Sequence, residues 1–221
     1  MMNIKILYED NHLLIVEKPV NVPVQEDETK NPDLLTMLKN DLKIRYNKPG
    51  NVYLGLVHRL DRPVGGVIVF AKTSKAASRL SDMLRRRAIQ RKYYAVVHGV
   101  PENKKGRLIH YLYKDKRQNL VFAVAKNHPE AKEAILDYEV LEAKNGLSLL
   151  SVQLHTGRPH QIRVQLASIG HPIVGDQKYG RRKGEQGQQI ALWAYYLKLE
   201  HPVRKEPVEA FSFPPKEYPW H

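Results

Sequence analysis

Cysteine is absent from all 221 residues of the chain. Its absence excludes a disulfide-linked scaffold, thiolate metal sites and a cysteine nucleophile. Long apolar runs are missing as well: VIVFA at 67–71 has the length of a strand and is far too short to cross a membrane. The first residues carry charges within their apolar stretch, unlike a signal peptide. We therefore expect a cytoplasmic protein without membrane segments.

Basic residues clearly outnumber acidic ones. The 36 Lys and Arg residues against 23 Asp and Glu residues give a formal net charge of +13. A protein with this excess usually meets a polyanion, because each phosphate contact releases counterions. Solubility alone could also explain the charge, but nucleic acid is the favoured reading. Membrane-surface binding is a weaker alternative, since no basic amphipathic helix of the needed length is present.

The hydrophobic pattern predicts an α+β fold with a mixed, largely antiparallel central sheet flanked by helices and loops. Helices are expected at 33–45, at 74–87 with Ser74 as its cap, and from Pro159 to Ile169. The second helix should turn Ala77, Leu80 and Leu84 inward. The expected strands are 4–8, 13–17, 53–57, 67–71, five segments between 92 and 154, 190–200 and 208–213. The polar segment 176–189 is either mobile or an RNA-contacting loop.

The stretch HRLDRPVGGVIVFAK at 58–72 places one carboxylate, Asp61, between Arg59 and Arg62. Polar residues at a turn between apolar strands are a common place for a functional site. An ordinary turn aspartate with charged neighbours would give the same pattern. The stretch alone therefore leaves a catalytic and a structural role open for Asp61.

A second polar turn, Thr-Gly-Arg at 156–158, leads into the third expected helix with Arg158, His160 and Arg163 close together. Arginines beside a helix N-terminus suit an anion, although a solvated basic surface is an equally good reading. Arg163 lies between two apolar residues, so it is expected to be partly buried and to need a carboxylate. Asp61 is one candidate partner.

Several other chemistries lack their motifs. No phosphate-binding G-x-x-x-x-G-K-[ST] loop, H-E-x-x-H metal motif or G-x-S-x-G nucleophile elbow occurs. His-Arg-Leu-Asp resembles part of the catalytic loop of protein kinases, but neither a glycine-rich phosphate loop nor Asp-Phe-Gly follows. Packing or RNA contact is favoured over metal binding for His155, His160 and His171. We expect neither a metal nor another cofactor.

The motifs together resemble the RluA-type family of RNA pseudouridine synthases. The 58–72 stretch is similar to the family's nucleophile segment, which implies that Asp61 is the catalytic aspartate. RKYYAVVHG at 91–99 resembles the segment with the active-site tyrosine, here Tyr93, and TGRPHQIRVQLASIGHPIVGD at 156–176 resembles the signature whose arginine is Arg163. VEKPVNVPV at 16–24 resembles the family's opening segment.

The resemblance implies a pseudouridine synthase catalytic fold, with residues 1–221 forming one catalytic domain without an N-terminal S4 domain. It implies a cofactor-free isomerase that acts on uridines of rRNA or tRNA, and we expect a monomer. Asp61 would be the nucleophile, Tyr93 would stack on the base, and Arg163 would pair with Asp61. The neighbouring Arg59, Arg62, Arg158 and His160 are expected to contact the RNA.

The chain departs from the family pattern at three places. Asn21 stands where glycine is usual, and asparagine tolerates positive φ well. Pro63-Val64-Gly65 replaces the more usual Asp-Thr-Ser, and Gln165 replaces a histidine. A non-catalytic RNA-binding or assembly protein on the same fold is the main alternative. An RNA hydrolase is a third, but it would need a metal site or a histidine pair.

Overall fold

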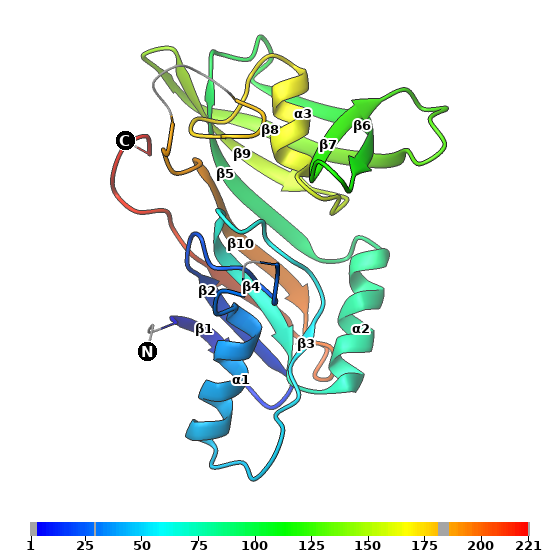
Figure 1. The fold of residues 1–221 in the computed structure, drawn as a ribbon, viewed down its shortest axis with the longest axis vertical. Helices are drawn as coiled ribbons and strands as arrows, with labels where there is room; N and C mark the ends of the chain where they lie inside the picture. Colours follow the sequence, from blue (N-terminus) through cyan, green and yellow to red (C-terminus); the bar gives the residue numbers. More distant parts are fainter. Residues whose placement is uncertain (1–3, 29, 181–185, 221) are drawn as a thin grey trace. The chain divides into compact units, whose positions relative to one another are not determined.

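The computed structural model describes residues 4–28, 30–180 and 186–220. Their contacts divide the chain into two compact units, which are described separately below (Figure 1). Unit 1 comprises Met1–Ile89 and Ala194–Phe213, and unit 2 comprises Gln90–Trp193 and Pro214–His221. The expected α+β class with a mixed, largely antiparallel sheet is confirmed. The expectation of one catalytic domain stays a prediction.

The strands of unit 1 form a sheet with the order β1-β2-β4-β10, in which β3 pairs with β4 and β11 pairs with β10. The strands are β1 (Ile6–Glu9), β2 (Leu13–Lys18), β3 (Gly55–Leu56), β4 (Gly65–Ala71), β10 (Leu192–Glu200, from Ala194 onward in this unit) and β11 (Pro207–Phe211). Every residue of β4 is buried, which explains its unbroken apolar sequence. This strand is the centre of the unit and carries the aspartate turn at its beginning.

Helix α1 (Leu34–Arg45) lies within the predicted segment 33–45. Leu34, Leu38 and Leu42 are its buried residues, one on each successive turn. Asp33 caps the helix, with its carboxylate accepting a hydrogen bond of 3.0 Å from the main-chain N–H of Thr36.

Helix α2 (Ser74–Arg85) corrects the expected cap. Thr73, and not Ser74, is the cap: its hydroxyl accepts a 3.2 Å hydrogen bond from the N–H of Ala76. Of the residues expected to face inward, Leu80 is buried, and Ala77 and Leu84 are partly buried and pack against the core. Ala76 and Met83 are buried on the same helix as well. Ala76, Leu80 and Met83 belong to the same core cluster as Val67, Val69 and Ala71 of β4.

Unit 2 has an antiparallel sheet with the order β5-β9-β8-β6-β7. Its strands are β5 (Gln90–His98), β6 (Lys105–Asp115), β7 (Leu120–Val124), β8 (Lys132–Lys144) and β9 (Leu147–Leu154). Asn145 and Gly146 join β8 to β9 with φ of 53° and 74°. Positive φ at both residues is what a two-residue hairpin turn with the right-handed strand twist requires.

Helix α3 (Gln161–Ser168) is shorter than the predicted Pro159–Ile169 segment, because His160 has a left-handed φ of 51° and stands outside the helix as its N-cap. The helix packs against β6 and β7 (Figure 1). Its Val164 joins Leu112, Val121 and Ala134 in a small core under the helix. None of the helices in the described ranges is both long enough and apolar enough to span a membrane.

Candidate active site

Asp61 lies in the connection between β3 and β4 in unit 1. Buried Leu60 and Val64 anchor this connection on both sides, while Asp61 itself is partly exposed. The N–H of Val64 donates a 2.9 Å hydrogen bond to the carbonyl of Asp61 and closes a tight turn. The predicted polar turn is therefore present, with its carboxylate next to the buried start of β4.

The second glycine after this turn has a steric role. Gly66 has φ +113°, and a Cβ there would lie 2.2 Å from the main-chain oxygen of Ala194 in β10. No side chain fits at that separation, and the backbone angle independently favours glycine. Gly66 thus lets β10 approach the strand that follows Asp61.

Lys18 was missed by the sequence interpretation. It is the last residue of β2, pairs with Gly66 and is completely buried. Its ammonium donates hydrogen bonds to three main-chain carbonyls, those of Pro19 at 2.8 Å, Val22 at 2.7 Å and Arg62 at 2.9 Å. Three donors meet three acceptors, so the buried charge is fully hydrogen-bonded. Lys18 joins the 19–22 turn to the residue that follows Asp61.

Lys18 also interacts electrostatically with Asp61. Burial lowers the pKa of the Lys18 ammonium to about 7, and the negative charge of Asp61 acts against this by favouring the protonated form. The positive charge of Arg62 lowers the Lys18 pKa further. The candidate nucleophile therefore has a buried cation as a neighbour.

The partly exposed side chain of Arg62 also connects the Asp61 turn to the segment that follows β2. Its Nε donates to the carbonyl of Asn21 at 3.1 Å, and its Nη1 lies 3.7 Å from the carboxylate of Asp27. Asn21 has φ 62°, a positive value that asparagine tolerates well. Arg59 is exposed. RNA contact stays a prediction for both arginines.

Tyr93 and Arg163 belong to unit 2. Tyr93 lies on β5 opposite Val152 of β9 and is 6% exposed. Arg163 is buried on α3 and forms a two-pronged ion pair with Asp176, with Nε 2.9 Å and Nη2 2.8 Å from the two carboxylate oxygens. Its guanidinium carbon also lies 5.2 Å from the ring centroid of Tyr179. The expected carboxylate partner of a buried arginine thus exists in Asp176, and the pairing with Asp61 stays a prediction.

The loop before α3 is held by a local hydrogen-bond network. Gln161 is buried, and its side-chain oxygen accepts from the hydroxyl of Thr156 at 2.8 Å and from the N–H of Arg158 at 3.0 Å. The Arg158 Nε donates to the carbonyl of Glu133 at 2.9 Å. His160 Nδ1 is 2.7 Å from the hydroxyl of Tyr179. The two predicted binding residues, Arg158 and His160, therefore stand on one hydrogen-bonded turn.

The histidines considered for a metal site have separate partners. His155 pairs with Asp137 at 2.7 Å, and His171 Nδ1 is 2.9 Å from the carbonyl of His98. Within residues 4–28, 30–180 and 186–220, no three His, Asp or Glu side chains are grouped to hold a metal ion. In the predicted polar segment 176–189, residues 181–185 lie outside the described residues.

Gln165, which replaces the family's histidine, is fully buried. Its amide nitrogen is within hydrogen-bond distance of His110 Nδ1, at 3.0 Å, and of the carbonyl of Ala134, at 3.2 Å. It therefore links α3 to β6 and β8.

Residues 12–168 match the family model described as RNA pseudouridylate synthase. The chain is 36% identical over 214 residues to ribosomal large subunit pseudouridine synthase C of Buchnera aphidicola, covering 93% of this chain and 65% of that protein. It is 34% identical over 229 residues to ribosomal large subunit pseudouridine synthase D of Haemophilus ducreyi, covering 97% and 68%. The chain thus spans about two thirds of the length of these relatives.

Two solved human structures are similar in fold. RNA pseudouridylate synthase domain containing 1 gives a TM-score of 0.75 at 26% identity, covering 96% of this chain and 84% of that one. RNA pseudouridylate synthase domain containing 4 gives a TM-score of 0.80 at 24% identity, covering 96% and 89%.

Proposed function

Because this chain belongs to the RNA pseudouridylate synthase family, we propose that it converts uridines of structured RNA to pseudouridine, with Asp61 as the nucleophile. The observation that carries the assignment of Asp61 is its position in the family-type turn, partly exposed and beside the buried ammonium of Lys18. A carboxylate is a group that can act as a covalent nucleophile.

The reaction rearranges one nucleotide. The bond between N1 of uracil and C1′ of ribose breaks, the base turns within its pocket, and C5 bonds to C1′. C5 loses its proton and N1 gains one, so no atom is added and no redox equivalent is needed. A covalent carboxylate intermediate divides one difficult step into easier ones. Attack on the base, attack on the sugar and removal of the C2′ proton are the three routes open to Asp61.

Tyr93 and Arg163 complete the proposed chemistry. We assign Tyr93 to stacking on the uracil ring, for which a largely buried tyrosine is suited. Arg163 is assigned to pairing with Asp61, in addition to its pair with Asp176. A guanidinium has five donors and can serve two carboxylates at once. Arg59, Arg62, Arg158 and His160 would hold the flanking RNA, and a uridine within a duplex would be flipped out.

The names of the relatives suggest which RNA to test first. Two of them are ribosomal large subunit pseudouridine synthases, so large-subunit rRNA is the leading candidate substrate, with tRNA as the second. The proposal includes a monomeric enzyme that works in the cytoplasm without metal or organic cofactor.

The test is tritium release from C5-labelled uridine in rRNA and tRNA transcripts, under single-turnover conditions, by the wild type and by Asp61→Asn. The substitution keeps the size of the side chain and removes its charge and nucleophilic oxygen. The rate should fall at least about a thousandfold, or roughly 4 kcal/mol of barrier, while RNA binding persists.

Asp41→Asn is the matched control, because Asp41 is a partly exposed carboxylate on α1 of the same unit, paired with Arg45. It should release tritium like the wild type. A folded Asp61→Asn protein with more than about a tenth of the wild-type rate would end the assignment of the nucleophile. Absence of pseudouridine with every RNA would favour the non-catalytic RNA-binding reading.

A further inference from the structure

The β6–β7 hairpin of unit 2 has two faces of opposite character. Leu112 of β6 and Val121 of β7 point inward to the core under α3. Side chains alternate along a strand, so Tyr111 and Tyr113 point to the side opposite Leu112. Phe122 pairs with Tyr113 and points to the same side as Tyr113. Ile109 continues this row along β6. We call these four residues, Ile109, Tyr111, Tyr113 and Phe122, the aromatic face.

The aromatic face is accessible. Ile109 is 54% exposed and Phe122 is 41% exposed, and both tyrosines are partly exposed. Large apolar side chains gathered at the surface are uncommon unless something binds them. Tyr111 and Tyr113 are two residues apart on one strand, roughly 6.6 Å, so each ring can meet a separate flat ligand.

The turn after β7 brings polar groups to the edge of this face. The ring of His128 packs on Tyr113 with centroids 4.6 Å apart, and the ammonium of Lys126 lies 5.9 Å from the ring centroid of Tyr111. His128 Nδ1 accepts a 3.2 Å hydrogen bond from the N–H of Glu130, so its Nε2 carries the proton of the neutral ring and can donate. Aromatic surfaces and cationic or donor groups therefore stand side by side.

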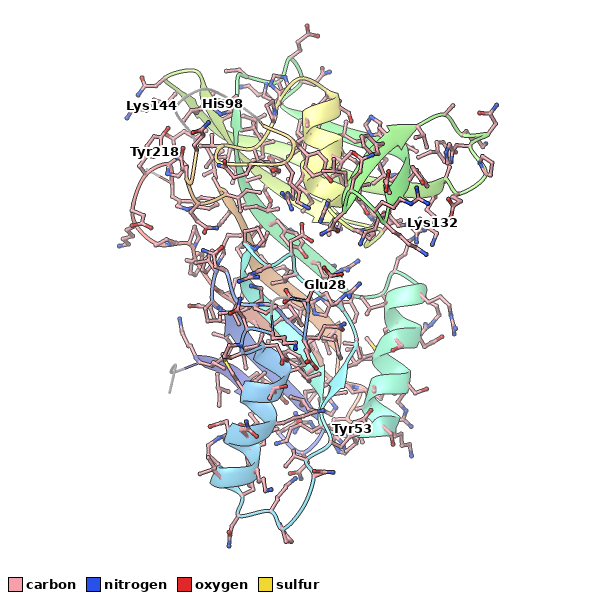
Figure 2. All side chains as sticks on the ribbon, viewed as in Figure 1. Glu28, Tyr53, His98, Lys132, Lys144 and Tyr218 are labelled. Carbon is pink, nitrogen blue, oxygen red and sulfur yellow. The ribbon has the colours of Figure 1, made fainter. Side chains whose placement is uncertain are left out.

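The charge of this region is strongly one-sided. Residues 104–132 contain eight Lys and Arg and two Asp and Glu, a net +6 out of +13 for the whole chain. One of the two acids, Asp115, accepts hydrogen bonds from the N–H groups of Arg117 and Gln118 in the hairpin turn. The basic side chains at 114, 116, 117, 126 and 132 are exposed, and Lys132 is labelled beside the hairpin in Figure 2. A partner that fits these rings and this charge has flat groups that are not base-paired and carries negative charge.

We propose that the aromatic face binds an unpaired segment of the RNA substrate, with bases stacked on Tyr113 and Phe122 and the phosphates near Lys126. This rests on the proposed function for the identity of the RNA. Base stacking on exposed rings tolerates any sequence, because every base has a π face, and basic side chains follow the backbone. A protein partner would not need the net positive charge. The face thus adds sequence-independent RNA binding to the recognition of the target uridine.

The test measures binding of a fluorescein-labelled oligoadenylate of about twelve nucleotides by anisotropy. This probe contains no uridine, so it reports stacking without the reaction. Phe122→Ala should weaken binding roughly five- to a hundredfold, the range for loss of one stacked base, and Phe122→Tyr should keep it. Phe213→Ala, at an exposed phenylalanine of unit 1, is the matched control and should bind like the wild type.

The charge is tested with Lys126→Gln against Lys43→Gln, at an exposed lysine of α1. Loss of a phosphate contact should make the slope of log affinity against log salt shallower by about 0.7 for Lys126→Gln only. Melting curves should show all variants folded, since the substituted side chains are exposed.

Equal binding by Phe122→Ala and Phe213→Ala, or no binding of the probe by the wild type, would overturn the aromatic face. Both results leave tritium release and its loss in Asp61→Asn untouched. Conversely, probe binding that depends on Phe122 in a protein that makes no pseudouridine would support the face and reject the enzyme.

Discussion

The ammonium of Lys18 donates a 2.9 Å hydrogen bond to the carbonyl of Arg62, the residue directly after Asp61. The same ammonium holds the carbonyls of Pro19 and Val22. One buried side chain thereby fixes two turns that are far apart in sequence, and one of them carries the candidate nucleophile. Lys18 acts on Asp61 through the backbone as well as through its charge.

Lys18→Met should therefore impair both stability and turnover. Methionine fills similar space but leaves three carbonyls without their donor, and each buried unsatisfied group costs about 1–3 kcal/mol. We expect the free energy of unfolding in urea to fall by at least about 2 kcal/mol. The single-turnover rate of the remaining folded protein should fall at least about tenfold, with little change in RNA affinity. Lys5→Met, at an exposed lysine of unit 1, should change neither; an unchanged rate in Lys18→Met would refute the positioning role.

The lowered pKa of Lys18 predicts a pH dependence. Its folded pKa is about 7 and its ordinary value is 10.5. Below pH 7 both states are protonated and the contribution of Lys18 is constant. Between the two values the unfolded chain binds the proton that the folded protein has lost, so the contribution rises with pH by up to about 1.4 kcal/mol per unit. The unfolding free energy of the wild type minus that of Lys18→Met should grow from pH 7 to pH 9; a flat difference would mean that Lys18 stays protonated.

Arg163→Lys should not be conservative. A single ammonium cannot reproduce the two-pronged contact with Asp176, so we expect a loss of roughly 1–3 kcal/mol in unfolding free energy. Asp176→Asn, which leaves the buried guanidinium uncompensated, should cost about 3–5 kcal/mol. If Arg163 also pairs with Asp61, turnover of folded Arg163→Lys drops well beyond any change in RNA affinity. Equal single-turnover rates for Arg163→Lys and the wild type would reject that pairing.

Gly66→Ala should abolish the fold of unit 1, because the new Cβ would lie 2.2 Å from the carbonyl oxygen of Ala194. Gly146→Ala is the control, since Gly146 also has positive φ, +74°, but no heavy atom within 4 Å of a new Cβ. That variant bears backbone strain alone, about 1–2 kcal/mol, and should melt only a few degrees lower. Similar melting temperatures for both variants would contradict the steric role of Gly66.

Local patterns in the sequence predicted the elements well and their ends less well. The spacing of Leu34, Leu38 and Leu42 in α1 predicts a helix, and the apolar run of β4 predicts a buried strand, from the local sequence alone. The start of α2 was wrong by one residue because Thr73 and Ser74 are both good caps, and only the backbone at Thr73 is extended. The predicted start of α3 at Pro159 was wrong because His160 is left-handed, so the helix begins only at Gln161.

The partners of buried charges could not be predicted in the same way. The sequence indicates that Arg163 needs a carboxylate partner, but it does not distinguish Asp61 from Asp176 as that partner. Asp176 stands at the end of the third signature, 13 residues after Arg163. Lys18 gave less signal still, since a lysine at a strand end is usually solvated, and only the fold shows that three carbonyls surround it.

All three acceptors of Lys18 are main-chain oxygens, which every amino acid supplies. The side chains at positions 19, 22 and 62 can therefore change during evolution without loss of the three hydrogen bonds from Lys18. No other amino acid at position 18 could donate all three from a single nitrogen. Pairwise covariation among relatives would find no partner for Lys18, although it contacts two separate turns. Contact maps inferred from covariation should consequently miss this attachment of the nucleophile turn.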